Sequence, residues 1–198
     1  MREAGPGRRV PRRRLFWRFR DAASKTRSHV DLTRTITVSP ATEADLPVIL
    51  TFIRGLAEYE KLSHACVATE AALHRTLFGE RPAAEVLIAR LGDAPVGFAL
   101  FFHSYSTFLA QPGIYLEDLF VLPEHRGRGA GKALLAQLAQ IARERDCGRL
   151  EWAVLDWNAP AIAFYQRLGA TVMPDWRICR MMPEQFNRLA KTAGGTKS

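Results

Sequence analysis

The chain is 198 residues long, a length typical of a single domain with one substantial core. Its net charge of +8 lies entirely in residues 1–34, where eleven Lys and Arg face Glu3, Asp21 and Asp31, so residues 35–198 sum to zero. A neutral main part argues against a nucleic-acid-binding domain, and the longest apolar run, about residues 96–102, is far short of the ~20 residues of a membrane span.

Residues 1–34 are predicted to be an extension outside the folded domain. They are rich in arginine, poor in acids, and carry an apolar cluster at residues 15–19. This composition is typical of a mitochondrial presequence, of an arm for nucleic acid or membrane surfaces, or of a translated upstream region. We expect a disordered, nonessential extension, because the regular pattern begins cleanly after it. We also expect a flexible tail at residues 193–198.

The first half of the predicted domain, residues 35–192, combines a strand, two helices and a hairpin. In chain order the segments are a strand at 35–39, a helix from 42 to about 62, a helix at about 69–78, and strands at 85–91 and 95–104. Thr42, with Asp45 three residues later, is an acidic variant of the capping box. Gly79 ends the second helix, and the Gly-Asp-Ala sequence at 92–94 is a hairpin signal.

The second half alternates strands and helices. The segments are a strand at 114–122, a helix to about 144, a strand at 149–155, a helix at 159–168, a strand at 176–182 and a short helix at 183–190. Asn158 is predicted to cap the second of these helices and Gly169 to end it. The order β-α-α-β-β-β-α-β-α-β describes a mixed α/β fold with antiparallel hairpins first and crossover connections later.

The three cysteines are Cys66, Cys147 and Cys179, which are far apart in the sequence and odd in number. No Cys-x-x-Cys pair and no His at metal-ligand spacing accompanies them. We therefore predict reduced thiols, no metal site and a cytoplasmic protein.

A glycine-rich turn at residues 126–132, Arg-Gly-Arg-Gly-Ala-Gly-Lys, joins the strand that ends near Leu122 to the next helix. Its glycines leave the backbone N–H groups of the helix N-terminus open, because no Cβ blocks a ligand. The helix dipole and the basic side chains favour an anion there. We interpret the turn as a cradle for phosphate, with an ordinary basic turn as the alternative.

Two common phosphate motifs do not fit this turn. In a Walker A loop, Arg126 would occupy the first glycine position and Ala133 would replace the Ser or Thr that binds the metal. In a dinucleotide fingerprint, Lys132 or Leu134 would occupy the third glycine position. A nucleotide bound in either of these two ways is therefore excluded.

The arrangement Arg126-x-x-Gly129-x-Gly131 resembles the acetyl-CoA pyrophosphate loop of the GNAT N-acetyltransferases. Three blocks are similar to the spermidine/spermine and thialysine N-acetyltransferase branch: residues 56–62, 115–121 and 153–170. The resemblance covers about residues 36–182. It implies the GNAT (acyl-CoA N-acyltransferase) fold, a mixed central sheet with splayed central strands flanked by helices. It also implies a homodimer.

The resemblance further implies transfer of the acetyl group of acetyl-CoA to a primary amine of a small cationic molecule such as a diamine, polyamine or lysine analogue, by direct attack through a tetrahedral intermediate. A backbone N–H stabilises the oxyanion, and we assign it to Val121. Tyr165 would protonate the departing thiolate, since a phenol with a pKa of ~10 stays protonated at neutral pH. The implied coenzyme contacts are Leu119, Phe120, Val121, Arg126, Gly127, Arg128, Gly129, Ala130, Gly131, Lys132, Asn158, Ala159, Pro160, Ala161 and Tyr165.

Glu117 is a carboxylate in an otherwise apolar strand, where an unpaired charge would be costly. We predict that it faces the gap between strands and serves as catalytic base or cation anchor, while Asp118 points to the opposite face and fixes a loop. The implied substrate-lining residues are Tyr59, Glu60, Glu117, Glu151, Trp152, Ala153 and Asp175. Structural alternatives stay open: an ion pair for Glu117, a core position for Tyr165, and capping alone for Asn158.

Three other functions are weighed against this interpretation. A protein or peptide N-acetyltransferase would need an open groove instead of an acidic pocket. A non-catalytic acyl-CoA-binding module is less consistent with the presence of both Tyr165 and Glu117. A nucleic-acid-binding protein is the least consistent, because the basic charge is confined to residues 1–34, and no membrane partner is expected.

Overall fold

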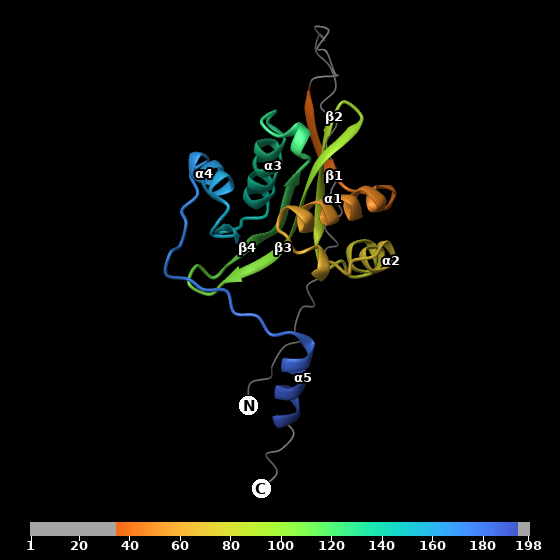
Figure 1. Ribbon diagram of the computed structural model, residues 1–198. Helices are drawn as coiled ribbons and strands as arrows, with labels where there is room; N and C mark the ends of the chain where they lie inside the picture. Colours follow the sequence, from red (N-terminus) through yellow and green to blue (C-terminus); the bar gives the residue numbers. More distant parts are fainter. Residues whose placement is uncertain (1–34, 194–198) are drawn as a thin grey trace, which may run out of the picture.

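The computed structural model describes residues 35–193, and the predictions for residues 1–34 and 194–198 lie outside this described part. At its centre is a five-stranded sheet with the order β1-β2-β3-β4-β5. The strands are β1 (Ile36–Pro40), β2 (Glu85–Leu91), β3 (Ala94–Ser106), β4 (Gln111–Val121) and β5 (Leu150–Trp152). The first four pair antiparallel with their neighbours, and β5 pairs parallel with β4. The predicted mixed α/β architecture is confirmed (Figure 1).

Helices cover both faces of this sheet. The helices on the sheet are α1 (Leu46–Tyr59) and α2 (Glu70–Leu73) on one face and α3 (Ala130–Glu144) on the other, and the chain continues with α4 (Ala159–Arg167) and α5 (Pro183–Thr192). One core lies between α1, α2 and the sheet, where Phe52 stacks on Phe98 with ring centroids 5.7 Å apart. The second core lies between α3 and the opposite face, with Leu134 and Leu138 fully buried. Because β2 and β3 are buried on both faces, their sequences are almost continuously apolar.

The predicted helix ends are confirmed. The backbone N–H of Thr42 donates to Asp45 Oδ2 at 2.8 Å, completing the capping box before α1. Asn158 Oδ1 accepts from the backbone N–H of Ala161 at 3.3 Å at the start of α4. Gly169 follows α4 with a φ of +93°. The helix predicted at 69–78 is α2 followed by a π-helical turn, η4 (His74–Phe78).

A bulge in β4 shapes the middle of the sheet. Leu100 of β3 faces Asp118 and the next residue, Phe101, faces Leu116, so Glu117 is an extra residue in β4. A bulge of this kind bends its strand. The pairing of β4 with β5 ends at the same place, since it joins Ile114–Leu116 to Leu150–Trp152 only. The strands therefore part beyond Leu116, as the fold prediction required, and the strand predicted at 149–155 is shortened to three residues.

The strand predicted at 176–182 is wrong. Residues 171–182 contain no strand, and every residue from 171 to 193 is exposed. Trp176 and Ile178 favour extended structure, but a strand also needs a neighbour to complete its hydrogen bonds, and this segment has none in the described chain. We call residues 171–193 the C-terminal arm, which ends in α5 at a distance from the sheet (Figure 1).

Across residues 35–193, no helix is long and apolar enough to cross a membrane. The same part of the chain contains no cluster of three or more His, Cys, Asp or Glu side chains that could hold a metal ion.

Candidate active site

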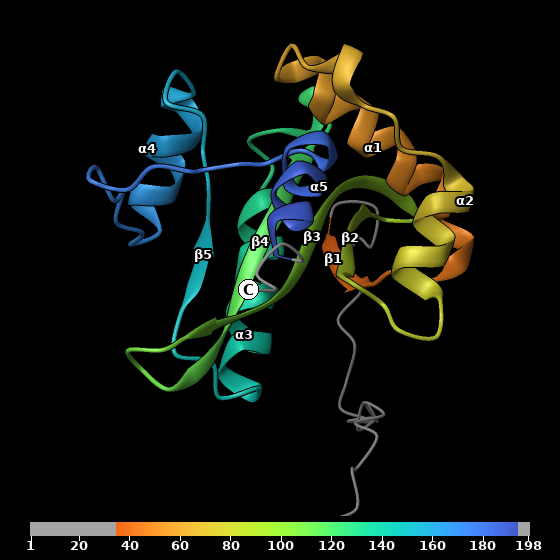
Figure 2. The ribbon, with the colours of Figure 1, turned by 90° about the horizontal axis from the view of Figure 1, so that it is seen from below.

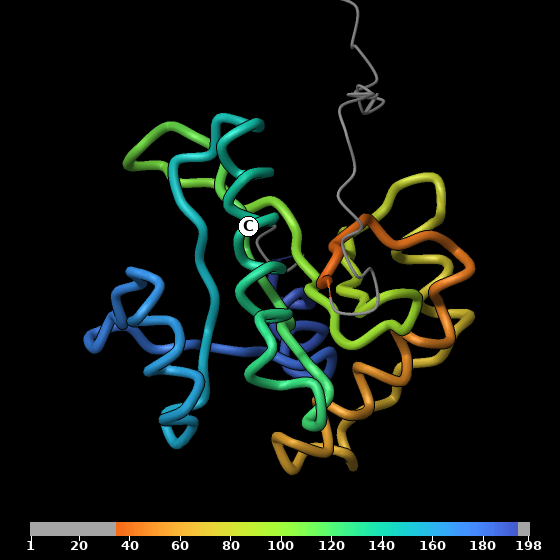
Figure 3. Tube along the Cα trace, turned by 90° about the horizontal axis from the view of Figure 1, so that it is seen from above, coloured from red at the N-terminus to blue at the C-terminus, as the bar shows by residue number. Residues whose placement is uncertain are grey.

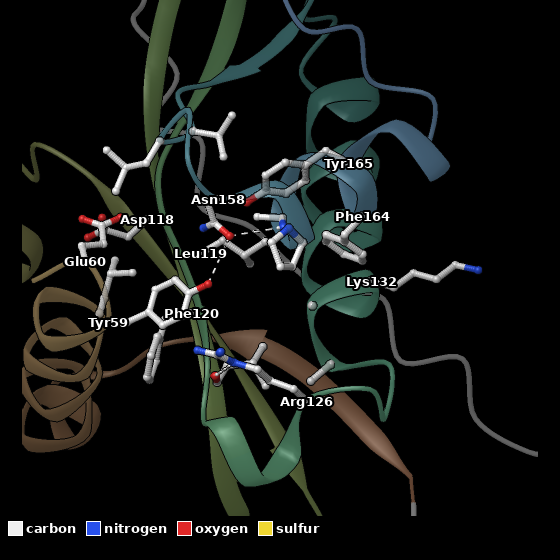
Figure 4. A pocket seen from close by; sticks show the side chains of 18 of the residues that line it. Tyr59, Glu60, Asp118, Leu119, Phe120, Arg126, Lys132, Asn158, Phe164 and Tyr165 are labelled. Carbon is white, nitrogen blue, oxygen red and sulfur yellow. Dashed lines mark hydrogen bonds between the residues drawn. The ribbon is translucent and has the colours of Figure 1, made fainter.

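The parting of β4 and β5 opens into a cavity of about 530 Å³ (Figure 4). Its walls come from the C-terminal end of α1, the part of β4 after the bulge, the glycine-rich turn, and the chain from residue 153 into α4. The lining residues that were predicted from the sequence are Tyr59, Glu60, Glu117, Leu119, Phe120, Val121, Arg126, Gly127, Gly129, Ala130, Gly131, Lys132, Ala153, Asn158, Pro160, Ala161 and Tyr165. Segments far apart in the sequence thus meet at one site.

One end of the cavity is the glycine-rich turn. Gly127 and Gly129 have φ angles of +75° and +94°, in the left-handed region that other residues rarely adopt, and a Cβ at either would have no atom within 4 Å. Gly129 is the N-cap of α3, so the first helical turn, whose N–H groups have no partner within the helix, begins at the wall of the cavity. The backbone here fits a phosphate-bearing ligand.

Arg126 joins this turn to the rest of the site. Its Nε donates to the backbone oxygen of Val121 at 3.1 Å, and its guanidinium lies over the Tyr59 ring, 4.6 Å from the centroid. The positive charge is therefore held at the wall of the cavity by a hydrogen bond and a cation–π contact. Lys132 extends away from the cavity in Figure 4, and its charge reaches the ligand site only at longer range.

Tyr59 connects α1 to α4. Its hydroxyl donates to Asn158 Oδ1 at 3.1 Å, the same oxygen that accepts from the backbone of Ala161, and its ring packs against Trp157 with centroids 6.0 Å apart. Tyr59 thus connects two walls of the cavity, through its hydrogen bond to Asn158 and its cation–π contact with Arg126. Its predicted contact with an amine substrate stays a prediction.

Three carboxylates line the opposite end of the cavity: Glu60, Glu117 and Asp118. The pKa of Asp118 is raised to about 6, first by burial and then by the negative charges of Glu117 and Glu60. Burial also raises the pKa of Glu60 above its ordinary value. In Figure 4 the side chains of Glu60 and Asp118 point toward one another. This end of the cavity attracts cations.

The prediction that Asp118 points away from the gap is wrong. It assumed that neighbouring residues of β4 alternate between the two faces of the sheet, and the bulge at Glu117 interrupts this alternation. Both Glu117 and Asp118 consequently line the cavity. The available signal was the acidic pair itself in an apolar strand, since regular alternation of the two faces would have buried one of the two neighbouring charges.

Tyr165 lies between the two ends. Its ring packs on Trp152 and Phe164, with centroids 5.0 Å and 5.4 Å away, and Figure 4 shows its hydroxyl end directed into the cavity. Burial raises the pKa of Tyr165, and Glu60 and Tyr59 add to the rise. The phenol therefore stays protonated at neutral pH and is able to donate a proton.

Five predicted site residues do not line the cavity: Arg128, Ala159, Glu151, Trp152 and Asp175. Trp152 supports Tyr165 from behind, Glu151 forms an ion pair with Arg149 at 2.7 Å, and Asp175 lies on the exposed arm. The lining residues that the sequence did not indicate are Leu56, Asp118, His125, Val154, Leu155, Phe164 and Arg167. Most of them are direct neighbours of predicted residues, so the segments were found although individual side chains were missed.

Comparison with known proteins gives consistent matches. The model of the acetyltransferase (GNAT) family matches residues 54–170. Thialysine N-epsilon-acetyltransferase from Bos taurus is 40% identical over 166 residues, covering 78% of this chain and 97% of that protein. L-ornithine N5-acetyltransferase NATA1 from Arabidopsis thaliana is 33% identical over 196 residues, covering 76% and 86%. Among solved structures, integron cassette protein VCH_CASS6 from V. cholerae superposes with a TM-score of 0.67 at 26% identity, covering 79% and 98%.

Proposed function

Because this chain belongs to the acetyltransferase (GNAT) family, we propose that it transfers the acetyl group of acetyl-CoA to a primary amine of a small cationic molecule, such as a diamine, a polyamine or a lysine analogue. The main support for this proposal is that the two ends of one cavity suit ligands of opposite charge. Open backbone amides and Arg126 lie at one end, and three carboxylates lie at the other. Acetyl-CoA carries negative phosphates and the amine carries positive charge, so each end suits one reactant.

The glycine-rich turn supplies the coenzyme end. In this proposal the amides of residues 127–132 donate to the diphosphate, and the coenzyme then follows the gap between β4 and residues 153–155. The backbone of residues 119–121 borders this gap, and an N–H at Val121 directed at the thioester oxygen would stabilise the oxyanion. One such donor is typically worth about 2.7–4 kcal/mol of the activation barrier.

The carboxylates supply the amine end. A primary ammonium must lose a proton before its nitrogen can attack, and a base works best when its pKa lies near the operating pH. Asp118, with a pKa of about 6, meets this condition, so we assign it the base, directly or through a water molecule. Glu117 is exposed at the bulge and suits the alternative role foreseen for it, an anchor for the positive charge of the substrate.

The proton balance closes through Tyr165. The neutral nitrogen forms a bond to the thioester carbon and becomes positively charged, and it then loses its extra proton to water in the cavity. The carbon–sulfur bond breaks, which leaves the amide and a thiolate. Tyr165, kept protonated by its raised pKa, gives its proton to that sulfur. The phenolate then recovers a proton from solvent, since the cavity is open at the mouth.

A substrate panel tests the proposal. Purified protein is mixed with acetyl-CoA and with diamines, polyamines, lysine analogues, neutral amines or lysine-containing peptides, and the release of free thiol is followed. We expect the highest kcat/KM with small molecules that carry a second positive charge. Preference for peptides would support a protein N-acetyltransferase instead, and acetyl-CoA binding without thiol release would support a non-catalytic module.

We propose further that the protein is a cytoplasmic homodimer and that residues 35–192 form the catalytic domain. Large apolar side chains left exposed on the C-terminal arm support a second copy as partner. Cys66, Cys147 and Cys179 are free thiols, which fits a reducing compartment. Light scattering of the full chain and of a chain that lacks residues 2–34 checks the dimer and the domain boundary, and cell fractionation checks the location.

A further inference from the structure

Two apolar side chains, Leu56 of α1 and Phe120 of β4, line the cavity from the side of the sheet that α1 covers. Leu119 and Val121, the neighbours of Phe120 in the strand, pack instead into the core under α3. Figure 2 and Figure 3 show, from below and from above, that α1 lies on one side of β4 and α4 on the other. We call Leu56 and Phe120 together the α1 wall.

The α1 wall is the apolar part of a polar surface. The other residues of α1 that line the cavity are Tyr59 and Glu60, and Figure 4 shows Asp118 directed toward Glu60. A cationic amine is attracted to the carboxylates, whereas an uncharged alkyl group is stabilised by apolar contacts. In the proposed reaction the thioester lies beside the backbone of residues 119–121, so its acyl group begins next to Phe120. The α1 wall is therefore in the position to contact that group.

The ring of Phe120 is held on several sides. The side chain is only 4% exposed, and its ring centroid lies 6.1 Å from that of Phe52. The guanidinium of Arg126 lies 5.9 Å from the same centroid. A ring enclosed in this way has no free space to move into, because protein cores are packed as densely as crystals of small molecules.

Gly55 brings the backbone of α1 against the end of this ring. A Cβ at Gly55 would lie 2.8 Å from Phe120 Cζ, which is closer than two carbon atoms can approach. Glycine is unfavourable inside a helix compared with alanine, so its presence in α1 has a packing reason. The ring rests on helix backbone, which cannot move aside as a flexible side chain does. Gly55 is thus a positioning residue for Phe120.

We propose that the α1 wall restricts the acyl group that this enzyme transfers to acetyl. The inference rests on the proposed function and specifies its acyl donor. A longer acyl chain has two directions open to it. Toward α1 it meets a ring that cannot retreat, and toward the carboxylates it occupies the space of the amine. The glycine-rich turn binds the coenzyme part in either case, so longer acyl-CoA molecules bind but react slowly.

The wild-type protein is tested with acetyl-CoA, propionyl-CoA and butyryl-CoA, using the amine that reacts fastest in the substrate panel. Free thiol is followed, and mass spectrometry identifies the acylated amine. A methylene group that a pocket cannot accommodate changes kcat/KM by about 10- to 200-fold, so we expect a loss of at least about 10-fold from acetyl-CoA to butyryl-CoA. Calorimetry should give similar dissociation constants for the three molecules, which places the loss in kcat.

Leu56→Ala and Phe120→Leu each remove volume from the α1 wall. In both variants we expect the ratio of kcat/KM for butyryl-CoA to that for acetyl-CoA to rise about 10-fold or more. Phe98→Leu is the matched control, because Phe98 is 0% exposed in the same core and does not line the cavity. It should lower Tm as Phe120→Leu does and leave the ratio unchanged. Leu56 is only partly buried, so Leu56→Ala keeps the test valid if both Phe variants are unstable.

Gly55→Ala acts in the opposite direction, because the added methyl group pushes the ring of Phe120 toward the cavity. We expect kcat for acetyl transfer to fall while the dissociation constant of acetyl-CoA stays the same. Phe120→Leu in the same chain removes the end of the ring and should restore part of the lost rate. A loss of rate that Phe120→Leu does not reduce would overturn the role of Gly55.

The outcomes separate this inference from the proposed function. Equal kcat/KM for acetyl-CoA and butyryl-CoA in the wild type would overturn the restriction by the α1 wall and leave amine acylation in place. An unchanged ratio in both Leu56→Ala and Phe120→Leu would do the same. If no acyl-CoA releases thiol with any amine of the panel, the proposed function itself is refuted, and the inference with it.

Discussion

Asp118 lies partly buried beside Glu117 and Glu60, and this environment sets its protonation. Its pKa rises from an ordinary value of 3.8 to about 6, first through burial and then through the two negative neighbours. Because the folded state holds the proton more tightly than the unfolded chain, the stabilisation from this group is present at low pH. It is lost as the pH rises from about 4 to about 6. An ammonium in the cavity would offset the repulsion and lower the pKa again.

Asp118→Asn tests the assignment of the base. In the wild type we expect kcat/KM to rise with pH through an ionisation near 6, since Asp118 accepts a proton only when ionised. The corresponding rise of kcat with pH should occur at lower pH, because the bound ammonium favours the ionised carboxylate of Asp118. The Asn variant should lose this pH-dependent rise together with most of its activity. Glu58→Gln, an exposed change outside the cavity, is the control, and a rise that persists in Asp118→Asn would reassign the base.

Tyr165→Phe keeps the ring that packs on Trp152 and Phe164 and removes only the proton. A general acid typically contributes about 10²–10⁴-fold to the rate, so we expect kcat to fall by about 10²-fold or more, with little change in acetyl-CoA binding. Steady-state kinetics with saturating acetyl-CoA measure this directly. Tyr105→Phe, at an exposed position, provides the comparison. Equal kcat in wild type and Tyr165→Phe would remove Tyr165 from the chemistry.

Tyr59→Phe distinguishes two roles of Tyr59, the hydrogen bond that connects α1 to α4 and a contact with the amine substrate. The variant loses the hydrogen bond to Asn158 but keeps the ring beneath Arg126. A hydrogen bond is worth about 0.5–1.5 kcal/mol net, so we expect the dissociation constant of acetyl-CoA to rise about 2- to 10-fold. Calorimetry gives this constant without the amine present. A change confined to the KM of the amine would instead favour the substrate contact predicted from the sequence.

For a single residue, the role can be predicted from the sequence when it depends on a short local pattern. Asn158 is recognisable because a cap needs only the following turn of helix, and Tyr165 lies on the same helix at a fixed spacing. Asp118 was missed because its direction depends on the pairing between β4 and β3, which places an extra residue at position 117. No local propensity encodes that register.

Among the elements, the glycine-rich turn before α3 combines a left-handed residue with a helix start. Gly129 has a φ of +94°, whereas Gly131 has an ordinary helical backbone, and a Cβ there would lie 3.5 Å from Phe164 Cζ, an ordinary contact. The two glycines therefore serve different purposes. The first permits the bend of the chain, and the second leaves space next to the amides.

Gly129→Ala and Gly131→Ala should accordingly differ in their effect on thermal stability. An L-residue in the left-handed region costs about 1–2 kcal/mol, which in a domain of this size lowers Tm by about 2–8 °C. We expect this loss for Gly129→Ala, with weaker acetyl-CoA binding, and a Tm near that of the wild type for Gly131→Ala. Thermal melts with and without acetyl-CoA measure both effects. Equal losses in the two variants would contradict the different roles of these glycines.

The elements that the sequence predicts correctly are those with local signals. The hairpin between β2 and β3 and the cap of α1 need only a few consecutive residues. The strand at 176–182 failed because a strand also needs a neighbour, and the strand at 149–155 was shortened because β4 bends away from it. Pairing between distant segments decides both cases.

On the scale of the whole molecule, the sheet with helices on both faces holds the two ends of the cavity in fixed positions. Two buried cores anchor α1 and α3 on opposite faces, so the carboxylates near the end of α1 and the amides at the start of α3 meet at the gap in the sheet. The net charge of residues 35–198 is zero, yet within this cavity opposite charges are separated. That separation is what allows an anionic coenzyme and a cationic amine to lie side by side.

The central claim is that backbone amides of the glycine-rich turn bind the diphosphate of acetyl-CoA. Amide resonances of the ¹⁵N-labelled protein, followed while acetyl-CoA is added, test it most directly. We expect the signals of Gly127, Gly129 and Gly131 to shift together and to saturate, while Gly92, in the turn between β2 and β3, stays in place. Saturable binding that leaves these three amides unmoved, or no binding at all, would contradict the claim.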